Sequence, residues 1–431
     1  MVQFVTENIT SCHLSFSCWH LVAQQSNEIC SGSNDRFGII EIIMNNMANP
    51  PFSSNTTLAP KPNSPKSLDY ITVLRFPLMV LVVALHTKLW VDALLDTDML
   101  SMARMVSELI TSLTMLAVPT FFVISGFLFF RNMPTEGAIP TRLFIQKMKA
   151  RFHSLFVPYM LWNAFVLVVK SLQYQLEGRE WREFLSWESF FGGQPLNFPL
   201  WYVRNLMMLC VLSPVIYMLL SSKLLRKPVM VVVLLNAVLL FLPGFFGVGA
   251  GSYFYFMLGA AVALNHSDLA DFVRPIGRAC VVLFFLFLSV KFILFAASMG
   301  VISLSIGSWM PPNVSEIYDT IYTILGVIAV LYSGSFYVTM KQQKQPNQAS
   351  VLSSRTQWLS ASTFFILVFH TPLPSVFSEK LLTRILPFHN DLVFTLNMLL
   401  SILLNLVICL VVYHFVLRLP QSWRKVILGH S

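Results

Sequence analysis

The sequence contains few charged residues. Only 11% of its 431 residues are Asp, Glu, Lys or Arg, whereas 55% are hydrophobic. A soluble globular domain usually has about a quarter of its residues charged, because that many polar side chains are needed to cover its surface. The composition therefore excludes a soluble globule of this length and predicts an integral membrane protein.

Acidic residues are also missing from the centres of the apolar runs. Glu316 and Asp319 lie at the end of one predicted helix rather than inside it. A carrier coupled to protons or sodium ions normally places carboxylates at mid-membrane, and many carriers are built from inverted repeats, of which the sequence shows no sign. Both absences disfavour a coupled transporter.

The cysteines form no C-x-x-C pair and no metal spacing. They lie in the polar N-terminal segment or within apolar runs: Cys12, Cys18, Cys30, Cys210, Cys280 and Cys409. The two histidines within apolar helices have no third ligand beside them. We therefore predict neither a disulfide framework nor a metal site. The net charge of +9 comes from basic residues in short loops without interleaved aromatics, so we predict no nucleic-acid partner.

Apolar runs of about 20 residues recur from position 70 to position 417, and each is long enough to cross a bilayer as a helix. We predict an all-α polytopic protein with about ten transmembrane helices, at residues 70–91, 109–130, 153–173, 201–221, 228–247, 252–265, 279–299, 317–338, 359–377 and 392–417.

The chain divides into three predicted parts. Residues 1–66 include the Pro/Ser/Asn-rich stretch "NPPFSSNTTLAPKPNSPKS", which predicts a flexible tail, and Met44 and Met47 are candidate translation starts. Residues 67–417 form the membrane domain, and residues 418–431 form a short cytoplasmic tail. The predicted outside loops hold only Arg104, Arg179, Arg182, Lys380 and Arg384, so the positive-inside rule places both termini in the cytoplasm.

Arg75 and His86 lie at the two ends of the apolar stretch "RFPLMVLVVALH". Eleven helical steps bring a residue back to within about 20° of the same face, roughly 16 Å further along, so both side chains should face one groove. An intramembrane arginine is costly unless it faces protein or water, which makes the pair a candidate functional site. Alternatively, Arg75 snorkels to the headgroups and His86 caps the helix.

His370 in "FFILVFHTPL" and Lys291 in "SVKFILF" are two further polar groups in apolar helices. Each is either part of a pocket or an interior residue that holds helices together by hydrogen bonds. Trp201 and Tyr202 are predicted to lie at the outer membrane boundary. Arg204 just beyond them would contact either the acceptor or lipid headgroups.

Six segments in this order resemble the acyltransferase-3 family of integral membrane acyltransferases, which includes bacterial O-acetylases of surface polysaccharides. They span about residues 67–417: "LRFPLMVLVVALHT" with Arg75 and His86, "VPTFFVISGFLFF" with the Ser125-Gly126-Phe127 signature, "KARFHSLFVPYMLW", "PLWYVRNLMMLCVLSP", "YFYFMLGAAVA" and "FFILVFHTPL". The chain departs from the family at Thr72, where an acidic residue is common, and at Ser154, where a second arginine often follows Arg151.

The resemblance implies a bacterial inner-membrane enzyme that moves an acyl group, here expected to be acetyl, from acyl-CoA to a hydroxyl of a carbohydrate or lipid-linked glycan. No permanently bound cofactor is expected. His86 would be the general base. Arg75 would stabilise the oxyanion or, with Lys149 and Arg151, hold the phosphates of the donor. Ser125, Trp201, Arg204, His370 and Lys291 would line the acceptor side.

Two other functions remain open at this point. The chain could be a non-catalytic transporter or flippase with a similar helix plan, or a structural membrane subunit whose polar residues only join helices. The acceptor, the acyl chain, the oligomeric state, the side on which the acceptor is modified and the choice between direct transfer and an acyl-enzyme are not determined by the sequence.

Overall fold

A computed structural model describes residues 68–92, 101–134, 140–178, 186–192, 194–221, 247–265, 268–298, 312–344, 352–387 and 390–429. Its elements are α4 (Asp69–Asp92), α5 (Ser101–Thr114), α6 (Ala117–Phe130), α7 (Thr141–Arg151), the π-helical turn η4 (Phe152–Phe156), α8 (Val157–Leu176), α9 (Trp187–Phe191), the 3₁₀ turn η6 (Phe198–Leu200), α10 (Trp201–Val211), α11 (Ser213–Ser221), α13 (Ala250–Leu264), α14 (Leu269–Val273), α15 (Gly277–Ser298), α16 (Pro312–Lys344), α17 (Ser354–Phe369), α18 (Leu373–Ile385), α19 (Asp391–Val416) and α20 (Gln421–Leu428).

These ranges contain helices and no strand, which confirms the prediction of an all-α polytopic membrane protein. Six helices in them are long and apolar enough to cross a membrane, and two bent helix pairs raise the number to eight. The apolar helix α13 is shorter, and most of the predicted span at 228–247 lies outside the described residues. The count of ten spans and the orientation of the termini therefore stay predictions.

Two predicted spans are broken rather than straight. The span at 201–221 bends by 58° between η6–α10 and α11, and the span at 359–377 bends by 84° between α17 and α18. Proline has no amide hydrogen and disfavours helical conformation in the residue before it. Pro214 follows the first break and Pro372 lies in the second, so each break has a cause that is visible in the sequence.

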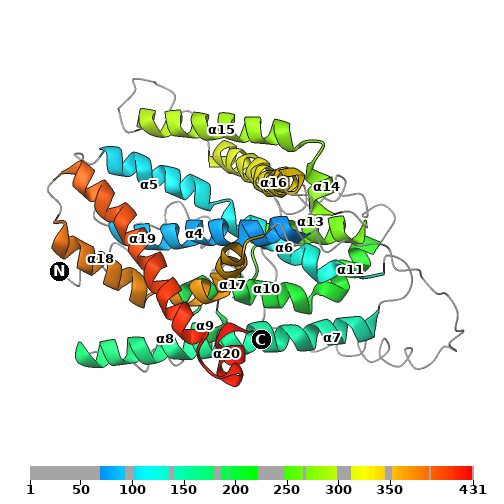
Figure 1. The fold of residues 1–431 in the computed structure, drawn as a ribbon. Helices are drawn as coiled ribbons and strands as arrows, with labels where there is room; N and C mark the ends of the chain where they lie inside the picture. The colour runs from blue at the N-terminus through cyan, green and yellow to red at the C-terminus, as the bar shows by residue number, and fades with distance from the viewer. Residues whose placement is uncertain are drawn as a thin grey trace, which may run out of the picture. The chain divides into compact units, whose positions relative to one another are not determined.

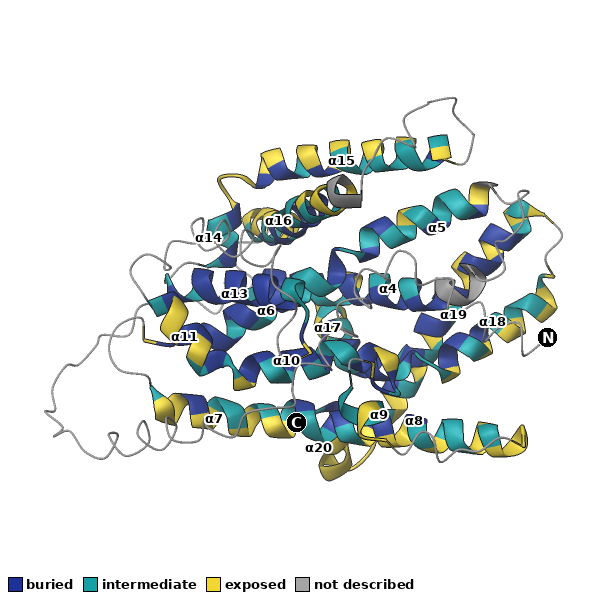
Figure 2. Cartoon of the chain, turned by 180° about the vertical axis from the view of Figure 1, so that it is seen from behind, coloured by how far each residue is buried: buried dark blue, intermediate teal, exposed yellow. Residues whose placement is uncertain are grey.

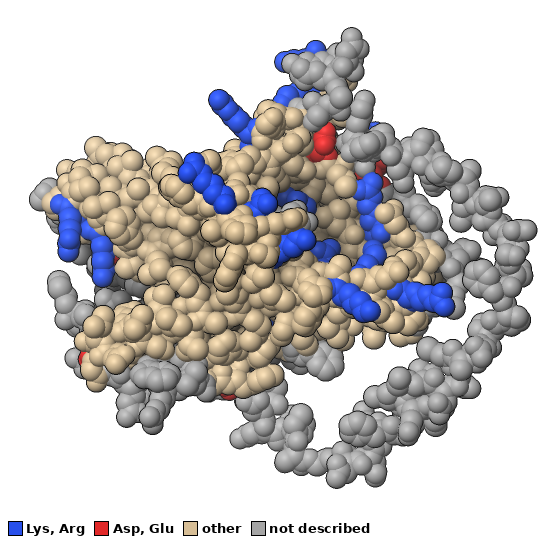
Figure 3. All heavy atoms as spheres, turned by 60° about the horizontal axis from the view of Figure 1, so that its bottom comes forward, with Lys and Arg blue, Asp and Glu red and all other residues tan. Residues whose placement is uncertain are grey.

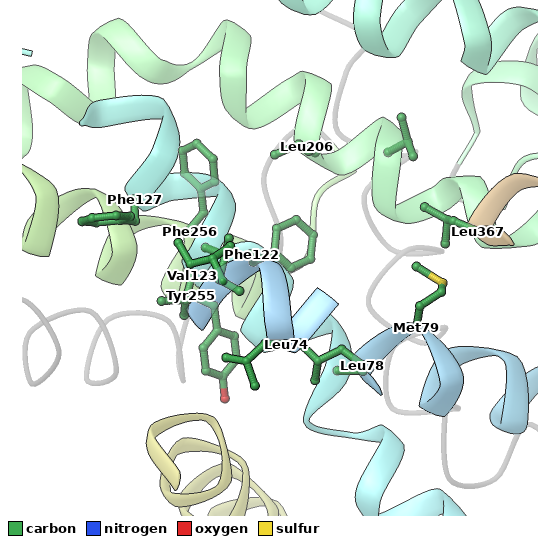
Figure 4. Close-up of a cluster of buried hydrophobic side chains, with 14 of the residues drawn as sticks. Leu74, Leu78, Met79, Phe122, Val123, Phe127, Leu206, Tyr255, Phe256 and Leu367 are labelled. Carbon is green, nitrogen blue, oxygen red and sulfur yellow. The ribbon is translucent and has the colours of Figure 1, made fainter. Parts of the chain in front are cut away.

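Helix α4 lies among α5, α6, α16, α17, α18 and α19, and Figure 1 shows it in the midst of the bundle. Its buried Leu74 and Leu78 belong to a core that also contains Phe122 of α6, Phe256 of α13 and Leu367 of α17 (Figure 4). Lipid tails are as apolar as these side chains, so close packing rather than escape from water has to hold such helices together. On α4, His86 and Thr87 are buried and Arg75 is partly buried.

Helices α6 and α13 pack with their backbones in close contact. A Cβ atom added to Gly126 would lie 2.0 Å from the carbonyl oxygen of Phe256, and one added to Gly259 would lie 1.9 Å from that of Val123. Small residues are needed where two membrane helices approach this closely. The glycine of the Ser-Gly-Phe segment thus has a packing role, which leaves the neighbouring Ser125 to face other partners.

Burial differs between the inner and outer helices. Figure 2 shows buried residues concentrated on α6 and α13, and exposed residues along α15, α7 and α8. The exposed side chains of α15 include Val282, Phe285 and Leu286, which are apolar. The outward-facing side chains of α15 are therefore suited to contact with lipid.

The C-terminal segment is helical where it is described. Helix α20 packs against α8, and the indole nitrogen of Trp162 donates to the Ile427 carbonyl at 3.1 Å. Its exposed side includes Trp423 and Lys425, a mixture typical of a helix that lies at a membrane surface. The division of the chain at residues 66 and 417 stays a prediction, because residues 1–67 lie outside the described part.

Candidate active site

Helix α4 carries Arg75 and His86 toward one short segment of the chain. The ring of His86 meets Phe198 edge-on, with 5.6 Å between ring centroids. Arg75 is close enough to Tyr202 for the two to interact electrostatically. Phe198 and Tyr202 are four residues apart in η6 and α10, which is one helical turn. The eleven-residue spacing on α4 therefore places both polar groups along one side of the helix.

The charged groups that act on Arg75 include a second arginine and no carboxylate. The charge of Arg151, at the end of α7, acts on Arg75, and neither guanidinium has a hydrogen bond or an ion pair with any residue in the described ranges. Two like charges at short range inside a protein repel each other. The described residues supply no counter-charge to either guanidinium, so a bound anion would be stabilised here.

The chain geometry around Arg151 is irregular. The π-helical turn η4 follows it directly, and Pro158 lies just beyond. Proline cannot donate to the carbonyl four residues earlier, here that of Ser154, so the regular α-helical ladder is interrupted at this point. Single π-helical turns inside long helices are frequent at functional sites.

Lys147, and not the predicted Lys149, accompanies Arg151 on the inner side of α7. Its ammonium group donates to the carbonyl oxygens of Phe129 and Arg131 at the end of α6, whereas Lys149 is exposed. Residues four apart share a helix face and residues two apart do not. Figure 3 shows Lys and Arg side chains gathered around a recess on the face to which α7 and α8 belong, with few acidic atoms in view.

Ser125 and Tyr202 meet at the Arg75 end of the site. Their hydroxyl oxygens are 3.0 Å apart, and the Tyr202 ring packs on Phe122 with 4.8 Å between centroids. The Tyr202 side chain thus contacts α6 inside the bundle, and its place at the outer membrane boundary stays a prediction. Trp201 packs partly buried against the same core.

The second histidine lies beside the first. The ring centroids of His86 and His370 are 5.2 Å apart, and His370 is fully buried at the break between α17 and α18. Asn405 of α19 donates to the hydroxyl of Thr87 at 2.9 Å and to the His370 carbonyl at 3.3 Å. This amide joins the helix that carries His86 to the break that carries His370.

Two residues predicted to line the acceptor side, Lys291 and Arg204, bind other residues of the chain. Lys291 forms an ion pair with Asp319 at 3.0 Å and lies over the ring of Tyr322. Arg204 donates from Nε to the Phe191 carbonyl and from Nη1 to the Gly247 carbonyl, both at 2.9 Å. Nη1 also donates to the side-chain oxygen of Asn205 at 3.1 Å.

Sequence reasoning missed four residues of this arrangement: Lys147, Tyr202 as an inward-facing group, Thr87 and Asn405. The signal for Lys147 was its four-residue spacing from Arg151. The signal for Asn405 was a polar amide within the long apolar run of α19, since such a group needs an interhelical partner. The partner of Tyr202 depends on where α10 begins relative to α6, which local sequence does not indicate.

Residues 68–414 match the family model of the acyltransferase-3 acyltransferase domain. Among characterised proteins, the chain is similar to the succinoglycan biosynthesis protein ExoH of Rhizobium meliloti (strain 1021). The two are 28% identical over 184 residues, which is 38% of this chain and 46% of that protein, so the match spans less than half of either. No solved structure matches the chain.

Proposed function

Because the chain belongs to the acyltransferase-3 family of membrane acyltransferases, we propose that it is an O-acyltransferase that moves an acetyl group from acetyl-CoA to a hydroxyl of a carbohydrate or lipid-linked glycan. The similarity to a protein named for succinoglycan biosynthesis supports a carbohydrate acceptor. The predicted enzyme class agrees with the family, while the donor, the acyl group and the acceptor are parts of the proposal.

The observation that carries the proposal is that two arginines, Arg75 and Arg151, lack a carboxylate partner among the described residues. Guanidinium groups bind phosphate oxygens in bidentate fashion, and coenzyme A presents several phosphates. Two such groups with no carboxylate partner among the described residues fit a phosphate-bearing donor better than a neutral sugar. We assign Arg75 and Arg151 to donor binding.

His86 would act at the other end of the donor. It lies eleven residues beyond Arg75 on α4, roughly 16 Å along the axis, so an extended donor held at Arg75 can bring its thioester toward His86. A ring nitrogen of His86 takes the proton of the acceptor hydroxyl while the oxygen attacks the thioester carbonyl. The carbon–sulfur bond then breaks, and the leaving thiolate takes the proton from His86.

This arrangement suggests an orientation in the membrane. Arg75, Lys147 and Arg151 gather at the end of α4 that the positive-inside bias places toward the cytoplasm. We therefore propose that the donor enters from the cytoplasmic side of a bacterial inner membrane and that His86 lies nearer the opposite side.

The test is His86→Gln, which keeps the side-chain size but removes the basic nitrogen. Loss of a general base should lower acyl transfer by about 10²–10⁴-fold while the protein still inserts. The measurement is mass spectrometry of surface glycans from a deletion strain that expresses each variant, with membrane levels checked by immunoblot. His414→Gln, an exposed histidine of α19, is the matched control. Full acylation by a normally inserted His86→Gln protein would overturn the proposal.

A further inference from the structure

The hydrogen bonds of His370 define its protonation. Its Nδ1 lies 2.8 Å from the carbonyl oxygen of Ile366, one turn earlier in α17. A carbonyl oxygen can only accept, so Nδ1 must carry the hydrogen. In neutral His370 the other ring nitrogen, Nε2, is then unprotonated and can only accept a hydrogen bond.

That acceptor has no partner in the described part of the chain. Nε2 of His370 is buried and makes no hydrogen bond, although polar atoms at this depth are nearly always paired. The residue as a whole is 0% exposed, so bulk water does not reach the atom. An unpaired buried acceptor of this kind requires an explanation from its neighbours.

His86 is the neighbour with a suitable donor. Its ring lies against His370, with 5.2 Å between centroids and a tilt of 48°, and the apolar ring of Phe198 also contacts it. His86 itself makes no hydrogen bond to the described residues and is only 9% exposed. Rings at this separation allow a hydrogen bond from a ring N–H of His86 to Nε2 of His370 when the two nitrogens point at each other. Such bonds are often long before substrate binds and tighten in the reacting complex.

We propose that His370 is a positioning residue for His86, a role that rests on the proposed function of His86 as general base. Nε2 of His370 accepts the N–H of His86, which leaves the other His86 nitrogen unprotonated and directed toward the acceptor hydroxyl. When His86 takes the hydroxyl proton, both of its nitrogens carry hydrogen and one stays bound to His370. The proton then passes from His86 to the departing thiolate, and His370 keeps its Nδ1 hydrogen throughout.

The backbone around the pair supports this role. The chain breaks by 84° directly after α17, which allows His370 to cap its own helix while its ring projects toward α4. Asn405 holds the His370 carbonyl and the hydroxyl of Thr87, the residue next to His86. Orientation of a catalytic histidine by a third group is a general feature of base-activated nucleophiles.

Two substitutions of His370 separate positioning from capping. In His370→Asn the amide nitrogen takes the place of Nδ1 and keeps the bond to Ile366, but nothing replaces Nε2. In His370→Gln the longer amide places an oxygen near the position of Nε2 and loses the bond to Ile366. Positioning therefore predicts that the Asn variant loses about 10²-fold in kcat and the Gln variant recovers at least tenfold of it, since correct orientation contributes at that level.

The measurement is steady-state acyl transfer by the purified full-length protein in detergent, with acetyl-CoA as donor and the native glycan as acceptor. We expect an unchanged KM for both substrates, because His370 touches neither. An Asn variant as active as the wild type, or a Gln variant no better than the Asn variant, would overturn the role of His370. The His86→Gln variant is measured alongside: if it stays active, the proposed function fails, and if it alone is inactive, only the role of His370 fails.

Discussion

Two regions of the protein hold cations at membrane depth, and they treat them differently. Between α15 and α16, Lys291 pairs with Asp319 at 3.0 Å and lies 5.3 Å from the ring centroid of Tyr322. Every feature of that site neutralises or covers the ammonium group. At the Arg75 end of α4, the charge of Arg151 acts on Arg75, and neither guanidinium has a carboxylate partner in the described ranges.

The difference indicates which cation awaits a ligand. A charge taken out of water is costly unless a counter-charge and hydrogen bonds replace the lost solvation. At Lys291 the protein itself supplies both, so the role of this lysine is to join two helices. At Arg75 and Arg151 it supplies neither, so the missing negative charge must come from outside the chain.

The largest effect that this comparison predicts is on donor binding. Arg75→Ala should raise the KM for acetyl-CoA by about 10²-fold, because a charge-assisted bond to phosphate contributes roughly 1.5–3 kcal/mol. Arg75→Lys should recover part of the loss, since a point charge remains but the planar fork does not. Arg151→Ala should act in the same direction, and initial-rate kinetics across a donor series measures all three.

The matched control is Arg142→Ala, which removes an exposed arginine from the same helix as Arg151. It should leave the donor KM unchanged. If Arg75→Ala and Arg151→Ala both kept the wild-type donor KM, the unpaired arginines would not bind the donor, and the contrast with Lys291 would lose its functional meaning.

The sequence allowed the helical fold and the pairing of Arg75 with His86 to be predicted, because both depend on local periodicity. A residue eleven positions along a helix has a fixed direction, whatever the helix packs against. The same periodicity would have predicted Lys147, rather than Lys149, on the helix face that carries Arg151. The breaks beside Pro214 and Pro372 also had local signals, although straight spans were predicted there.

The contacts between distant segments could not be predicted in this way. His86 and His370 are adjacent only because α17 ends beside α4, and Tyr202 reaches Ser125 only because α10 begins inside the bundle. Neither helix position follows from hydropathy, which is nearly uniform along these segments. The pairing of Lys291 with Asp319 was equally hidden, since the two residues lie on different helices.

A smaller effect is predicted at the paired cation. Asp319→Asn leaves Lys291 without its counter-charge and should lower the free energy of unfolding by about 1–2 kcal/mol, a moderate value because the Asp319 side chain is 42% exposed. The measurement is thermal unfolding in detergent, with kcat and KM for folded protein expected to stay at wild-type values. Lys291→Met combined with Asp319→Asn should restore part of the stability, because it removes both charges.

The kcat of the Asp319→Asn variant tests whether Lys291 has only a structural role. A fall in kcat for Asp319→Asn at normal protein levels would mean that Lys291 takes part in the reaction. The α15–α16 pair would then belong with Arg75 and Arg151 rather than stand apart from them.

The smallest effect is predicted at Arg204, the predicted acceptor-side cation whose Nε and Nη1 donors are used within the chain. Arg204→Lys keeps the charge but can satisfy fewer of its three partners, the Phe191 and Gly247 carbonyls and the Asn205 side chain. We expect a loss of up to about 1 kcal/mol in the free energy of unfolding, the typical net contribution of a hydrogen bond. The KM for the acceptor should not change, because the hydrogen bonds from Nε and Nη1 hold the guanidinium against its own chain. A raised acceptor KM in a normally stable Arg204→Lys protein would instead place Arg204 in the acceptor site and show that a cation bonded to its own chain can still bind substrate here.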